Sequence, residues 1–106
     1  MTECLDLPDR YRRQVEALLA EHVPETEVWA HGSRVKGDSH PASDLDLVVR
    51  SPTLEPIPVG RLGSLEEALE DSGIPILVEA HDWARLPESF HEQIQKQHIV
   101  LQRTRS

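Results

Sequence analysis

Two carboxylates stand two positions apart in residues 44–49, where aspartates alternate with apolar residues before the run turns fully apolar. This alternation is typical of a β-strand with one buried face. Successive side chains of a strand point to opposite faces, so we expect Asp44 and Asp46 on one face, about 6.6 Å apart. Such a pair repels itself unless a cation or a shared proton relieves it, and oxygen ligands suit Mg²⁺. Alone, the spacing favours a solvated edge strand, so the neighbouring residues decide.

Residues just upstream have the chemistry of a phosphate-binding turn. Gly32 and Ser33 follow a short β-prone run, residues 27–31. Glycine lets the backbone approach an anion without a Cβ, and serine offers a hydroxyl and an N–H. The following loop adds further polar and basic residues, namely Arg34, Lys36 and Ser43. We therefore expect phosphate groups to bind here, next to the aspartate pair.

Gly32-Ser33, ten intervening residues and then residues 44–47 together resemble the signature of the polymerase-β-like nucleotidyltransferase superfamily. The chain is most similar to the minimal nucleotidyltransferase branch, in which GSRxKG, a short loop and SDLDL follow one another as they do in residues 32–37 and 43–47. The resemblance covers nearly the whole chain. It implies that Gly32 and Ser33 hold the triphosphate of ATP, and that Asp44 and Asp46 carry two Mg²⁺ ions.

The resemblance also implies a third carboxylate on a neighbouring strand, usually an aspartate, that acts as metal ligand and general base. In the predicted strand over residues 74–82, Glu79 shares a face with His81, while Asp82 has the parity of the core side. Glu79 is therefore the candidate. A glutamate is one methylene longer than an aspartate, and a displacement of about 1 Å can cost on the order of a hundredfold in rate.

The elements that position these residues alternate along the chain. Helices are predicted over residues 8–22, 65–72 and 87–97, and strands over 27–31, 44–49, 74–82 and 99–101. The second helix is expected to start after Ser64, which forms a capping box with Glu67, and to stop at Gly73. This order predicts an α/β (α+β) fold with a small mixed sheet and helices packed on one face, the nucleotidyltransferase fold of the resemblance.

Length and composition limit the class of protein. A chain of 106 residues with 38% hydrophobic residues has room for one domain, residues 1–106. A net charge of −8 disfavours direct nucleic-acid binding, which needs a basic field. The single Cys4 excludes an internal disulfide, and neither a membrane span nor a signal peptide is expected, so the cytoplasm is the predicted compartment.

Six histidines raise the question of a zinc site, but they lack paired spacing and cysteine companions. Two of them, His31 and His81, either border the nucleotide or are structural. Trp29 has the parity of the open face, where it would suit base stacking or a partner, although core packing is the better expectation.

The predicted activity is Mg²⁺-dependent transfer of AMP or another nucleotidyl group, from ATP or another nucleoside triphosphate, to a hydroxyl, with release of pyrophosphate. No second domain is expected to hold an acceptor, and by resemblance the partner is a HEPN-domain toxin that this chain modifies, on a tyrosine, as antitoxin. Two alternatives stay open. One is a binding module that neutralises or scaffolds its partner by contact. The other is a small-molecule nucleotidyltransferase resembling the aminoglycoside enzymes, in which a homo-oligomer builds the acceptor pocket.

Overall fold

The computed structural model describes residues 5–37 and 43–103. Its elements follow in the order α1 (Asp9–His22), β1 (Glu27–His31), α2 (Ser33–Lys36), β2 (Leu45–Arg50), α3 (Val59–Asp71), β3 (Val78–Asp82), the 3-10 turn η1 (Trp83–Arg85), α4 (Glu88–Lys96) and β4 (Ile99–Gln102). This confirms the predicted α/β class. No helix within the described ranges is both long and apolar enough to cross a membrane.

The four strands form one mixed sheet in the order β3-β2-β1-β4. β1 runs antiparallel to β2 and β4, whereas β2 and β3 are parallel. Parallel neighbours need a crossover connection, and α3 supplies it here. The register aligns His31 with Asp46 and Asp46 with Glu79, so residues from three strands stand in one row across the sheet.

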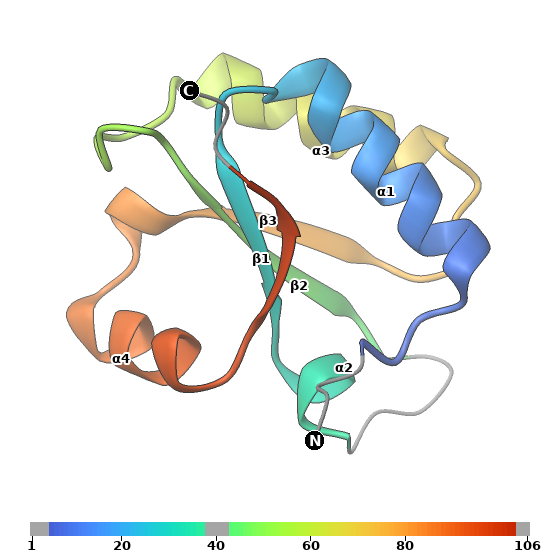
Figure 1. Ribbon diagram of the computed structural model, residues 1–106. Helices are drawn as coiled ribbons and strands as arrows, with labels where there is room; N and C mark the ends of the chain where they lie inside the picture. The colour runs from blue at the N-terminus through green and yellow to red at the C-terminus, as the bar shows by residue number, and fades with distance from the viewer. Residues whose placement is uncertain (1–4, 38–42, 104–106) are drawn as a thin grey trace.

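Helices α1 and α3 pack side by side on one face of the sheet, whereas α4 lies on the other side (Figure 1). The main core fills the space beneath α1 and α3, and its largest buried side chains include Val15, Leu19, Val28, Leu47, Val49 and Leu65. A smaller cluster on the opposite face joins Trp29, Val48, Trp83 and Ile94. The expectation that helices pack on one face therefore holds for α1 and α3, while α4 covers part of the second face.

Helix α3 differs from its prediction at its start. It begins at Val59, directly after Pro58, so Ser64 lies inside the helix and the predicted capping box is wrong. The reason is packing, because Leu62 is buried in the main core and extends the apolar stripe by a turn toward the N-terminus. The predicted end is confirmed, since Gly73 follows the helix with a φ of 81°.

The strand predicted over residues 74–82 is shorter at its start. β3 begins at Val78 and ends at Asp82. Pro75 lacks the N–H that a ladder needs, so the strand does not extend back to residue 74. β2 begins at Leu45, so Asp44 precedes the strand rather than belonging to it. The other predicted elements lie within one residue of their expected ends.

Candidate active site

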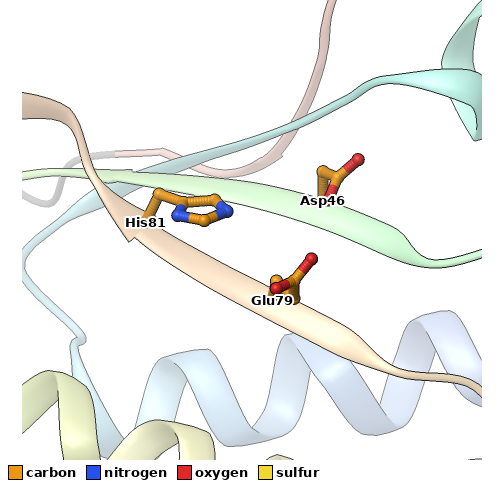
Figure 2. A group of neighbouring side chains, drawn as sticks. All are labelled: Asp46, Glu79 and His81. Carbon is orange, nitrogen blue, oxygen red and sulfur yellow. The ribbon is translucent and has the colours of Figure 1, made fainter. Parts of the chain in front are cut away.

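Asp46, Glu79 and His81 gather on the open face of the sheet (Figure 2). Asp46 comes from β2 and the other two from β3, and one ligand atom of each lies within 4.8 Å of the others. The alternation of buried and half-buried residues along β3 confirms that Glu79 and His81 share the face opposite the core. Two carboxylates offer the oxygen ligands that Mg²⁺ prefers, with an imidazole nitrogen beside them, so this group fits a divalent cation.

Burial raises the pKa of the Asp46 carboxyl above its ordinary value. The neighbouring His81 lowers this pKa, and the negative charge of Asp44 raises it. Desolvation and a like charge both disfavour the ionised carboxylate, so a bound cation would stabilise it.

Asp44 is exposed and lies one residue before β2. It is close enough to influence the pKa of Asp46, but it is not a member of the three-residue group, whose third member is His81. The predicted set of Asp44, Asp46 and Glu79 is therefore only partly reproduced.

Gly32 turns the chain at the end of β1 with a φ of 87° and a ψ of −158°. A Cβ at this position would lie 2.6 Å from Oδ2 of Asp46, so only glycine allows the backbone to approach this carboxylate. The Gly32 carbonyl accepts hydrogen bonds from the amides of Val35 and Lys36, which start the short helix α2 at Ser33. Gly32 and Ser33 thus lie beside the acidic group, as their predicted role requires.

Arg34 has a different environment from the one a phosphate ligand would need. Its side chain is buried, with 4% of the residue exposed, and its Nη1 donates to the Asp6 carbonyl at 2.6 Å. Its Nε donates to the Ser43 carbonyl at 2.9 Å. These bonds tie the segment before α1 and the segment before β2 to α2, so they favour a bracing role for Arg34 and Ser43 over direct phosphate binding.

A pocket of about 380 Å³ opens beside the acidic group. One part of its wall comes from β1, α2 and β2, through His31, Gly32, Lys36 and Asp46. The other part comes from α4 and the residue after it, through Phe90, Gln93, Ile94 and Gln97. The exposed Lys36 thus lies where the sequence expected a phosphate-binding cation. The sequence analysis did not predict that α4 contributes to this site. Its polar residues were the only indication, and they lie more than forty residues after the aspartates in the sequence.

His31 lines this pocket and is held neutral. Burial, followed by the nearby His81 and Lys36, lowers the pKa of His31 to about 4. Its Nε2 is buried without a hydrogen-bond partner among the described residues. His31 lines the pocket and His81 belongs to the three-residue group, so both lie next to Asp46, and that they border a nucleotide stays a prediction.

Asp82 is excluded from the site, as its parity predicted. It is buried on the core side, where Oδ2 accepts from the Ile57 amide at 2.8 Å and Oδ1 accepts from the Ala84 amide at 3.1 Å. Arg85 pairs with the same carboxylate at 2.6 Å.

Trp29 packs in the smaller cluster on the other face of the sheet, as the better expectation had it. Its ring centroid lies 5.5 Å from that of Trp83, and 7% of the residue is exposed.

Solved structures with the same fold come from toxin–antitoxin complexes. A crystal structure of a toxin-antitoxin with AMP-PNP matches with a TM-score of 0.73 at 21% identity, over 89% of this chain and 74% of that chain. A tri-AMPylated Shewanella oneidensis HEPN toxin in complex with MNT antitoxin matches with a TM-score of 0.70 at 18% identity, over 92% and 74%. At these identities the likeness is one of fold.

Sequence comparison shows the family as well as the fold. A Haemophilus influenzae protein named "Probable protein adenylyltransferase MntA" is 40% identical over 98 residues, which span 92% of this chain and 84% of that protein. The family model of the nucleotidyltransferase domain matches residues 12–103. Because the family model covers most of the chain and the relative is aligned over most of its own length, the chain belongs to the nucleotidyltransferase domain family.

Proposed function

We propose that this chain transfers AMP from ATP to a hydroxyl group of a HEPN-domain toxin and thereby acts as its antitoxin in the cytoplasm. The observation that carries the proposal is the convergence of Asp46 and Glu79 beside the Gly32 turn, where Asp46 and Gly32 also line a pocket. The name of the Haemophilus influenzae relative and the AMPylated toxin of the Shewanella oneidensis complex support the donor and the acceptor. The family match over residues 12–103 supports one domain over residues 1–106.

In the proposed reaction, the acceptor oxygen attacks the α-phosphorus of ATP. The bond from this phosphorus to the oxygen that bridges to the β-phosphate breaks, and pyrophosphate leaves. Glu79 accepts the proton of the attacking hydroxyl. Asp44, Asp46 and Glu79 would hold two Mg²⁺ ions, which would supply positive charge to neutralise the triphosphate and to lower the pKa of the hydroxyl.

The predicted nucleotide-binding residues divide into two roles. Gly32, Ser33 and Lys36 contact the triphosphate in this proposal, because they lie at the pocket wall or at the turn beside Asp46. Arg34 and Ser43 position that turn through their mutual hydrogen bond. Loss of either should therefore act through the fold of the turn.

The decisive experiment is to co-express the chain with the protein encoded by the neighbouring gene, which we expect to be the HEPN-domain toxin, and to weigh that protein by intact mass spectrometry. The parent should add AMP to the toxin, and the double variant Asp44→Asn with Asp46→Asn should add none. Glu70→Gln, which changes an exposed carboxylate on α3, is the matched control and should leave the modification unchanged.

Glu79→Gln separates binding from transfer, because it keeps the shape and removes the charge. It should bind MgATP nearly as well as the parent and lose transfer, whereas full transfer would refute the general-base role. A toxin that is bound and silenced without added mass would favour neutralisation by contact. A neighbouring gene unrelated to HEPN proteins would remove the antitoxin role and leave small-molecule acceptors to be tested.

A further inference from the structure

Phe90 is the single phenylalanine of the chain, and 53% of it is exposed on α4. It lines the pocket that Asp46 borders, together with Gln93 and Gln97. Phe90 and Gln93 are three residues apart and share one side of α4, and Gln97 directly follows the end of the helix. An aromatic ring and two amides, together with the buried Ile94, thus form this part of the pocket wall.

The helix that carries Phe90 is fixed to the sheet by other side chains. Ile94 is 3% exposed and packs in the smaller cluster, next to Trp29 and Trp83. The ring of His98 stacks on Trp29 and that of His91 on Trp83, both with 3.8 Å between centroids. These contacts hold α4 to the sheet while 53% of Phe90 stays exposed, and Phe90 is not part of the smaller cluster, so packing in that cluster does not account for its place at the pocket.

The two parts of the pocket wall differ in chemistry. Asp46, Lys36 and Gly32 on one part suit a cation and phosphate oxygens. Phe90, Gln93 and Gln97 carry no charge, so they suit a planar polar ring instead. The volume of about 380 Å³ lies within the range of small-molecule sites, which is roughly 300–1,000 Å³.

We propose that Phe90 and Gln93 form the nucleobase subsite, in which the Phe90 ring stacks on the adenine of ATP and the Gln93 amide binds its edge. This inference rests on the proposed function, because the triphosphate must occupy the part of the pocket beside Asp46. Every base has a π-face that can stack on an aromatic ring, so Phe90 supplies affinity. A glutamine amide donates and accepts, which matches N6 and N7 of adenine, so Gln93 supplies selectivity.

The test uses calorimetry of the full chain with two probes. One is the Mg²⁺ complex of α,β-methylene-ATP, which cannot release pyrophosphate, and the other is magnesium tripolyphosphate, which has no base. Phe90→Ala should weaken binding of the first about tenfold, the equivalent of 1.4 kcal/mol, and leave binding of the second unchanged. Leu77→Ala, a variant of another exposed apolar residue, 51% exposed and outside this pocket, should change neither.

Two further variants separate stacking from edge recognition. Phe90→Trp keeps an aromatic face and should keep the parent affinity. Gln93→Ala should reduce the preference for ATP over GTP by about tenfold. These variants also carry the test if Phe90→Ala does not fold.

The outcomes distinguish this inference from the proposed function. If the parent binds neither probe, the proposed function fails and the inference fails with it. If the parent binds both and Phe90→Ala binds the nucleotide analogue as tightly, only the nucleobase subsite is refuted. The same unchanged affinity, accompanied by weaker binding of the HEPN protein, would also refute the subsite and would assign this side of α4 to the partner.

Discussion

Replacement of Gly32 by alanine tests the geometry of the site most directly. The added Cβ would lie 2.6 Å from Oδ2 of Asp46, whereas ordinary van der Waals contacts begin at 3.4 Å. The backbone also has a φ of 87° and a ψ of −158°, a region that is essentially restricted to glycine. The substitution therefore combines backbone strain with a displacement of the carboxylate that we place at the metal.

The two costs can be separated in magnitude. Strain of this kind costs about 1–3 kcal/mol. Moving the contact from 2.6 Å to between 3.0 and 3.4 Å requires a shift of 0.4–0.8 Å in Asp46 or in the turn. Since a misplacement of about 1 Å can cost on the order of a hundredfold in rate, we expect AMP transfer to fall by about ten- to a hundredfold.

Gly37→Ala is the matched control. Gly37 has a φ of 88°, but a Cβ there would have nothing within 4 Å. It should lose about 1–2 kcal/mol from backbone strain alone and keep its transfer rate. At about 4–8 °C per kcal/mol for a domain of this size, thermal unfolding followed by circular dichroism resolves both variants.

A double-mutant cycle then isolates the contact itself. Asp46→Ala removes the oxygen that the new Cβ would meet, so Gly32→Ala should destabilise that background less than the parent, by a coupling energy of about 0.5–2 kcal/mol. If Gly32→Ala matched Gly37→Ala in stability and in transfer, or if the cycle showed no coupling, the close approach of the turn to Asp46 would be refuted.

Three further predictions concern Arg34, Asp82 and His31. Arg34→Ala should lower the free energy of unfolding, measured by equilibrium urea unfolding, by about 2–3 kcal/mol, because the carbonyls of Asp6 and Ser43 lose a charged donor. A loss of MgATP affinity without a loss of stability would instead favour direct phosphate binding by Arg34. Asp82→Ala should destabilise by about 2–4 kcal/mol while the folded fraction retains transfer, and selective loss of transfer would return Asp82 to the site. Folding lowers the pKa of His31 from 6.5 to about 4, so between these pH values the unfolded chain binds more protons than the folded one. The free energy of unfolding of the metal-free protein should therefore decrease as the pH falls from 6.5 to 4, by about 1–2 kcal/mol given the partial exposure of His31. A His31→Gln variant with the same pH profile of stability would contradict this.

Side-chain parity was the part of the site that the sequence predicted well. The alternation along residues 78–82 is local, so it separates Glu79 and His81 from Asp82 without any knowledge of the neighbouring strands. The same reasoning fails where a residue type has two uses. Arg34 lies next to the Gly32 turn, where the sequence predicts phosphate binding, and only its burial and its hydrogen bonds in the structure favour a bracing role over a ligand role.

Packing between segments that are distant in the sequence decides two features that local sequence patterns could not predict, the start of α3 and the position of Phe90. The capping box at Ser64 is a valid local signal, but the burial of Leu62 extends the helix past it. Phe90 and Ile94 are four residues apart, a spacing that is typical of a helix but does not tell which of the two is buried. The structure buries Ile94 against the tryptophans and leaves Phe90 at the pocket, and this division depends on where α4 meets the sheet.

Strand order and register turn these local patterns into a site. Asp46 lies on a strand between β1 and β3, so its neighbours in the row are His31 on one side and Glu79 on the other. A slip of one residue in β3 would bring Ala80 opposite Asp46 and reverse the face of every side chain on the strand. Glu79 would then enter the main core as a charged group without a partner. The burial of Val78 and Ala80 therefore fixes the same register that brings the two carboxylates together.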